Sequence, residues 1–139
     1  MPYEIIYQNS KGVLITNYSG VLTDEEFREC AAKKFSQREI TKSYLYSISD
    51  LTALTGFDVS TEALKLNAFE SKKVLSENVS GFMVVVASDG FMFGMGRLWA
   101  AHAEGNSDRV HVFKTRKEAD AWIEQKLAGV AGLEGTLIP

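Results

Sequence analysis

Residues 82–99 read FMVVVASDGFMFGMGRLW, and this stretch decides the class of fold. Its first part, Phe82 to Ala87, is apolar without alternation, which is typical of a strand buried on both faces. Such strands occur in parallel sheets that carry helices on their faces. We therefore expect an α/β protein in which helices cover both sides of this strand.

The segments on either side of this stretch alternate between strands and helices. Strands are expected over residues 3–8, 12–18, 43–49 and 109–114, with the first two joined as a hairpin and Asp50 closing the third. Helices are expected from Thr23, from Asp58 or Ser60 to about Glu77, from about Phe91, and from Thr115 to Leu127. The order β-β-α-β-α-β-α-β-α predicts a mixed, mostly parallel sheet of about five strands covered by about four helices.

Length and composition set the broad class. The 139 residues predict one domain over residues 1–128, followed by a tail at 129–139 whose glycines argue against a helix and favour a flexible or partner-docked end. A net charge of −3 argues against a nucleic-acid surface. No apolar run reaches the roughly 20 residues of an integral membrane segment. The first residues show no signal-peptide pattern, so we expect a cytoplasmic protein.

The glycines of the quoted stretch fit a packed helix better than a phosphate loop. A dinucleotide fingerprint needs a third glycine where this chain has Trp99, and the G-K-[ST] of a P-loop is absent. On a helix that starts near Phe91, one apolar stripe forms, and Gly94 and Gly96 flank it; its members are Phe91, Met95, Leu98, Trp99 and His102. Two helical glycines cost roughly 1 kcal/mol each. We expect the sheet, a second subunit or a ligand to press close to the backbone, with Gly94 at that contact.

Residues that could carry catalysis are few. His102 and His111 are interpreted as structural histidines, Cys30 as a small buried hydrophobe, and no metal or cofactor motif occurs. Asp50 stands where α/β folds bind ligands, outside the carboxyl end of a strand, although it can equally cap the next turn. A cleft of Asp50, Arg97 and His102 is a minor enzymatic alternative. We expect no enzyme activity and no cofactor.

Three motifs resemble a known family. YSISDL at 46–51, FGMGR at 93–97 and EADAWI at 118–123 are similar, in order and context, to the SpoIIAA-like proteins. Those proteins are bacterial relatives of the STAS domain of anti-sigma-factor antagonists. The resemblance implies a STAS-like fold, no known enzyme activity, and a regulatory or small-ligand module.

The resemblance also bears on a phosphorylation switch. In the antagonists, an aspartate that ends the third strand is followed eight residues later by Asp-Ser-Ser-Gly, whose first serine is phosphorylated. Counting from Asp50 reaches Asp58, but Val59 occupies the acceptor position. The switch is therefore expected to be lost, unless Ser60 has replaced it as a phosphorylated helix cap.

Two hypotheses of function follow. The first is a non-enzymatic STAS-like protein-interaction module, expected to be a homodimer. Its candidate partner or ligand surface comprises Asp50, Leu66, Phe69, Phe93, Gly94, Met95, Arg97 and Trp99. The alternative is a carrier or sensor of a small apolar or lipid-like ligand, held by Phe82, Met83, Phe91, Met92, Met95 and Trp99.

Overall fold

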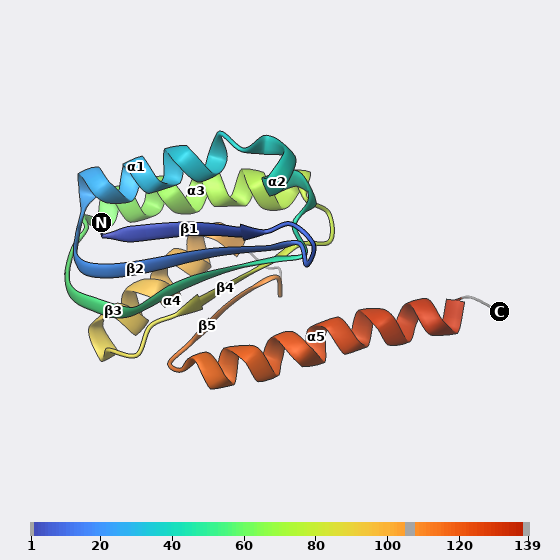
Figure 1. The fold of residues 1–139 in the computed structure, drawn as a ribbon. Coiled ribbons are helices and arrows are strands. Elements are labelled where there is room, and N and C mark those ends of the chain that lie inside the picture. The colour runs from blue at the N-terminus through green and yellow to red at the C-terminus, as the bar shows by residue number, and fades with distance from the viewer. Residues whose placement is uncertain (1, 105–107, 138–139) are drawn as a thin grey trace.

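The computed structural model describes residues 2–104 and 108–137, which form one five-stranded sheet and five helices (Figure 1). In chain order the elements are β1 (Tyr3–Gln8), β2 (Val13–Thr23), α1 (Asp24–Phe35), α2 (Arg38–Ser43), β3 (Tyr46–Asp58), α3 (Thr61–Glu77), β4 (Phe82–Val86), α4 (Gly90–Glu104), β5 (Val110–Phe113) and α5 (Arg116–Leu137). The expected α/β class is confirmed. The short helix α2 was not expected, because six residues are too few for an apolar periodicity to show.

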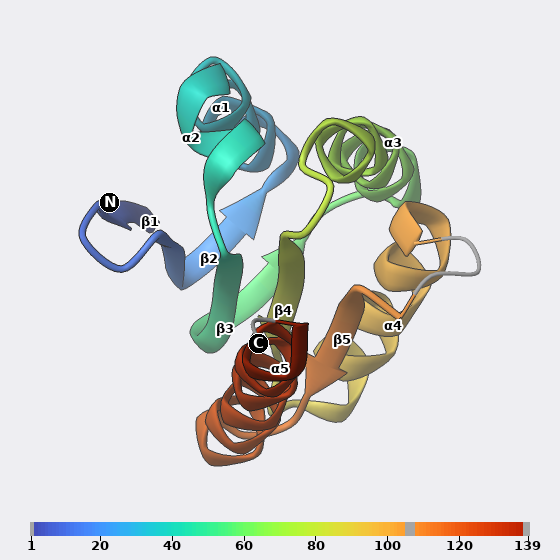
Figure 2. The same cartoon turned by 90° about the vertical axis from the view of Figure 1, so that its right-hand side faces the viewer.

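The sheet is mixed and mostly parallel. Its strand order is β1-β2-β3-β4-β5, with β1 antiparallel to β2 and every other pair parallel. Helices α1 to α4 lie over one face and α5 lies over the other (Figure 2). On β4, Val84 packs with Ile123 of α5, whereas Met83 packs with Leu75 of α3 and Ala100 of α4. Both faces of β4 are therefore buried, as its unbroken apolar sequence predicts.

The third strand is longer than expected. We expected it to end at Asp50, but β3 continues to Asp58. Its pairing with β4 does end at Asp50, which lies opposite Val86, and the rest of β3 pairs only with β2. Asp50 therefore lies within a strand, although it stands at the last paired position beside β4. The extension is possible because β2 is also long and runs on to Thr23, which pairs with Asp58.

The expected helix starts are confirmed. Thr23 and Ser60 are the N-caps of α1 and α3, and each side chain accepts a hydrogen bond from a backbone N–H three residues on. Thr115 accepts one from the Glu118 N–H at the start of α5. Capping satisfies backbone donors that a helix leaves unpaired, so short polar side chains at these positions fix the helix boundaries.

The last helix differs from the expectation at its other end. Residues 129–137 continue α5 to Leu137, so the prediction that the glycines exclude a helix there is wrong. Figure 1 shows this C-terminal part of α5 extending past the end of the sheet. Residues 138–139 lie outside the described part of the chain. Docking of the tail on a partner stays a prediction.

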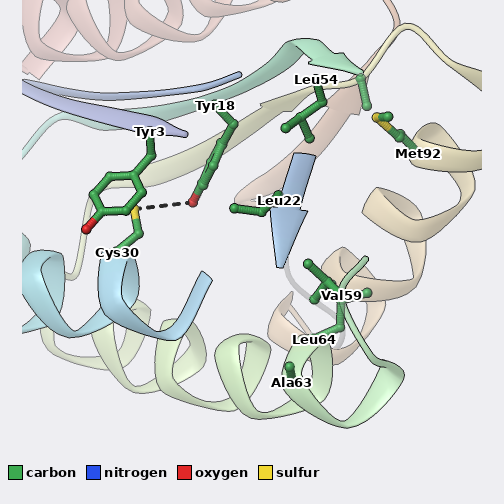
Figure 3. Close-up of a cluster of buried hydrophobic side chains, with 10 residues drawn as sticks. Tyr3, Tyr18, Leu22, Cys30, Leu54, Val59, Ala63, Leu64 and Met92 are labelled. Atoms are coloured by element: carbon green, nitrogen blue, oxygen red, sulfur yellow. Dashed lines mark hydrogen bonds between the residues drawn. The ribbon is translucent and has the colours of Figure 1, made fainter. Parts of the chain in front are cut away.

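One core cluster fills the space between the sheet and helices α1, α3 and α4 (Figure 3). Cys30 of α1 is fully buried there, and its thiol contacts the Tyr18 hydroxyl at 3.7 Å. Burial is the main cause that raises the pKa of Tyr18 well above its ordinary value. Cys30 thus serves as the small core residue that the sequence suggests.

Candidate functional site

The glycine-rich part of the quoted stretch begins α4, and backbone N–H groups in the first turn of this helix already have hydrogen-bond partners within the chain. The Asp89 carboxylate accepts hydrogen bonds from the backbone N–H groups of Phe91 at 2.8 Å and Met92 at 3.3 Å. A carboxylate at this position satisfies the donors that a phosphate would need and repels an anion. The structure therefore favours the helix interpretation of the stretch.

The buried face of α4 is rotated from the expected one. Its buried residues are Met92, Gly96, Ala100 and Ala103, while Met95 and Trp99 are half-buried. Phe91 and Leu98 are 63% and 37% exposed, and His102 is also exposed. The prediction that these three residues lie on the packed stripe of the helix is therefore wrong. Small residues face the sheet because they allow the helix to approach it closely. A Cβ on Gly96 would lie 3.1 Å from Val112 Cγ1.

Gly94 lies in the first turns of the helix, as expected, but not at a close contact within the chain. It is exposed, and no heavy atom lies within 4 Å of where its Cβ would be. The expectation of a close backbone approach is therefore wrong for Gly94 within one chain and correct for Gly96. Gly94 instead shares the outer side of α4 with Phe91 and Leu98, at helical spacings of three and four residues.

The neighbouring helix α3 has two outward apolar residues of its own, of which Leu66 also lines a groove between α1 and α3. Leu66 and Phe69 are 54% and 55% exposed, as their helical phase predicts. Figure 2 shows α3 and α4 side by side over the same face of the sheet. We call the set Leu66, Phe69, Phe91, Gly94 and Leu98 the outer apolar face.

Other members of the predicted surface lie elsewhere. Phe93 packs against the core cluster under the Lys114 ammonium, which is 5.1 Å from its ring centroid. Arg97 is exposed, and it forms no ion pair within residues 2–104 and 108–137. Met95 and Trp99 face inward and line a cavity instead.

That cavity lies between the sheet and helices α1, α3 and α4 and has a volume of about 80 Å³. Of the predicted ligand-binding residues, Met83, Met92, Met95 and Trp99 line it. Phe82 does not, because it packs under α5, and Phe91 is at the surface. The sequence pattern thus found four of the lining residues but placed two aromatic residues on the wrong side.

The cavity also has polar walls, which the sequence analysis missed. Ser47 and Ser49 reach it from β3, and Asn67 reaches it from α3, where it accepts a hydrogen bond from Trp99 Nε1 at 2.8 Å. The Tyr44 hydroxyl is buried without a hydrogen-bond partner in the described chain, although Ser47 lies beside it. The two serines, at alternate positions of one strand, were the available signal, since alternate residues share a face of a sheet.

Desolvation explains the electrostatics of two further lining residues. Burial raises the pKa of Tyr44 to about 12, with Ser47 and the Arg109 charge acting in the opposite direction. Burial lowers the pKa of Lys34, which reaches the cavity from α1. Each shift marks a group whose charged form is poorly hydrated.

Asp50 belongs to neither surface. Its carboxylate accepts hydrogen bonds from the Thr52 N–H and hydroxyl at 2.9 and 2.6 Å and pairs with Arg116 of α5 at 3.2 Å. Since α5 covers the opposite face of the sheet from α4, Asp50 does not meet Arg97 or His102, and the cleft of the enzymatic alternative is not formed (Figure 2).

His111 and Ser60 have packing and capping contacts. The His111 ring packs against Phe113 and Trp122, at centroid distances of 5.8 and 4.5 Å, and these two rings also contact each other. The Ser60 hydroxyl donates to Asp24 at 2.7 Å, and the Ser60 N–H does so at 2.6 Å. A phosphate on Ser60 would face the Asp24 carboxylate, so phosphorylation there stays a prediction that this contact opposes. Within the described ranges, no cluster of side chains is suited to hold a metal ion.

The strand order and helix layers define an α/β domain with a mixed, mostly parallel five-stranded sheet. No protein-family model matches the chain, and no curated protein matches it in sequence. The structure is similar to the crystal structure of an uncharacterised DUF3478 family protein from Shewanella loihica PV-4, which has the SpoIIAA-like fold that the sequence resemblance implied. The two chains are 17% identical, the match covers 86% of this chain and 90% of the other, and the TM-score is 0.49. Across 2–104 and 108–137, no helix has the length and apolar character needed to cross a membrane.

Proposed function

We propose that this protein is a non-enzymatic, STAS-like regulatory module of the cytoplasm that acts by binding protein, first of all a second copy of itself. The observation that carries the proposal is the outer apolar face. Phe91, Leu66 and Phe69 are each more than half exposed, and Leu98 adds to the same surface. Large apolar side chains that are exposed on two neighbouring helices support an interaction site there.

Gly94 strengthens this argument. A glycine inside a helix costs roughly 1 kcal/mol relative to alanine, and no contact within the chain requires it here. It lies between Phe91 and Leu98 on the exposed side of α4. A missing side chain between two large apolar ones lets another backbone approach closely. Arg97, which is exposed beside them, supplies an anchor of the type enriched in interfaces.

The oligomeric state tests the proposal. We expect size-exclusion chromatography with light scattering to show a dimer at high micromolar concentration. Phe91→Asp is expected to give a folded monomer, because it places a charge in the centre of the contact. Val79→Asp is the control, since Val79 is 85% exposed, follows the end of α3 at Glu77 and is not part of the outer apolar face. A wild-type monomer at every concentration, or equal effects of both variants, would overturn the dimer.

A second candidate function is favoured by the cavity. We propose, as the alternative, a carrier or sensor of a small apolar or lipid-like ligand. Flexible methionines line the cavity and allow it to adapt to an occupant. Native mass spectrometry of protein purified from cells is expected to show a bound small molecule. Ligand-free preparations whose Trp fluorescence is unchanged by fatty acids would exclude this function.

A further inference from the structure

One charged side chain, that of Lys34, lines the cavity. Lys34, near the C-terminal end of α1, lines it together with Tyr18, and the Lys34 ammonium lies 5.9 Å from the Tyr18 ring centroid. Within the described part of the chain, no carboxylate pairs with Lys34, whereas the adjacent Lys33 pairs with Glu29 at 3.3 Å. A half-buried cation without a counter-ion is costly, so it gains from an anion that enters the same space.

The unpartnered Tyr44 hydroxyl is a second, independent sign of an occupant. Tyr44 is 2% exposed, and its hydroxyl forms no well-aligned hydrogen bond, although the Ser47 side chain lies beside it; a buried hydroxyl in this state is destabilising. Phenylalanine would fill the same volume without that cost. The hydroxyl is therefore of use where a polar atom, from a ligand or from a water bound with it, enters the cavity.

An outer groove lies next to the cavity. It lies between α1 and α3, has a volume of about 330 Å³, and is lined by residues that include Ala31, Ala32 and Leu66. Phe27, Phe35 and Asn67 line both the groove and the inner cavity. Two aromatic side chains and one amide thus form the boundary between solvent and the interior.

The size of the cavity limits what it can hold. Its volume of about 80 Å³ is roughly half that of the ~150 Å³ engineered cavity that accommodates benzene. By this comparison the cavity as it stands holds roughly three carbon atoms, and a chain of about six fits only if Met92 and Met95 change rotamer and enlarge it, as methionines can. A long-chain lipid does not fit without a larger rearrangement.

We propose that the cavity binds a short-chain monocarboxylate, whose apolar chain lies among the methionines and whose carboxylate pairs with Lys34. The Tyr44 hydroxyl gains in the complex the hydrogen-bond partner that it lacks in the free chain. This inference rests on the second proposed function and specifies the ligand of that function, which is a monoanion with a short carbon chain. It is independent of the dimer.

Matched ligands test the charge. Calorimetric titration with hexanoate and with 1-hexanol compares two molecules of equal chain length that differ in the head group. We expect hexanoate to bind at least tenfold more tightly. In Lys34→Met this preference is expected to disappear, whereas Lys33→Met, with the same change in net charge at the next residue, is expected to keep it. Lys34→Arg restores the charge and is expected to restore the preference.

The outcomes separate the inference from the function on which it rests. If hexanol binds as well as hexanoate, the cavity is an apolar site. The proposal that the ligand carries a carboxylate is then wrong, although the carrier function stands. If neither ligand binds, both are wrong. Tyr44→Phe is expected to weaken hexanoate binding several-fold without unfolding the chain, and an unchanged affinity would remove Tyr44 from the site. In an NMR titration with hexanoate, the chemical-shift changes are expected at the residues that line the cavity. Changes confined to surface residues would also overturn the proposal.

Discussion

Replacing Gly96 by alanine tests how closely α4 packs on the sheet. The new Cβ would lie 3.1 Å from Val112 Cγ1 and 3.7 Å from Val85 Cγ1, and the first distance is shorter than ordinary van der Waals contact. Overpacking of this kind costs about 1–3 kcal/mol, while alanine returns about 1 kcal/mol of helix propensity. We expect Gly96→Ala to lower the free energy of unfolding by about 1 kcal/mol.

Gly94→Ala is the matched control on the same helix. It gives the same gain in propensity and meets no atom within 4 Å, so it should stabilise the monomer by about 0.4–1 kcal/mol. The difference between the two variants isolates the packing cost, which is about 1–3 kcal/mol. Urea unfolding at low micromolar concentration measures both without contributions from association. If Gly96→Ala is as stable as Gly94→Ala, the close approach of α4 to β5 is refuted.

A double-mutant cycle locates the clash. Val112→Ala removes both Val112 methyl groups, of which Cγ1, at 3.1 Å, is the atom nearest to the new Cβ. The double variant Gly96→Ala/Val112→Ala is therefore expected to be more stable than the sum of the single effects, by about 0.5–2 kcal/mol. Strictly additive effects would show that the cost of Gly96→Ala arises elsewhere.

Three further predictions concern polar contacts. Asn78→Ala should cost at least about 2 kcal/mol in urea unfolding, because the buried amide binds three backbone groups; a loss under about 1 kcal/mol would contradict this. Arg109→Lys should cost about 1–2 kcal/mol, since the guanidinium donates to three carbonyls that one ammonium cannot reach together, and an unchanged midpoint would argue against that role. The hydrogen bonds from Ser60 lower the pKa of Asp24, so the stabilisation is present above the ordinary carboxyl pKa of about 4 and is lost as pH falls through the depressed value. The destabilisation by Asp24→Asn should therefore shrink in acid, and a constant difference across pH would refute the linkage.

Much of the architecture was predictable because it depends on local chemistry. The capping residues Thr23, Ser60 and Thr115 mark helix starts through hydrogen bonds that span only three residues. The unbroken apolar run of β4 requires cover on both faces, whatever provides it. Asp50 was misplaced within its strand because the length of β3 depends on its pairing with β2, and pairing partners are not local.

The candidate site was predictable only in part, for the same reason. Leu66 and Phe69 were expected to point outward because helical phase alone places them opposite Leu64 and Leu75. The roles of Gly94 and Gly96 were not separable, since both fit beside the expected stripe and only the position of Val112 distinguishes them. No sequence pattern marked Lys34 and Tyr44 as site residues, because they line one cavity only through the way α1 and α2 pack over β3.

By itself, the sequence determined the class of fold, the helix starts and the burial of β4, because periodicity and capping are set by neighbouring residues. Only the tertiary structure decided which face of α4 meets the sheet, how far β3 runs, and that a cation and an unpaired hydroxyl line the same cavity. These features arise where segments distant in the chain come within a few ångströms. The free energy of each such packing depends on the side chains of both segments in contact. The sequence of one segment therefore cannot predict the packing by itself.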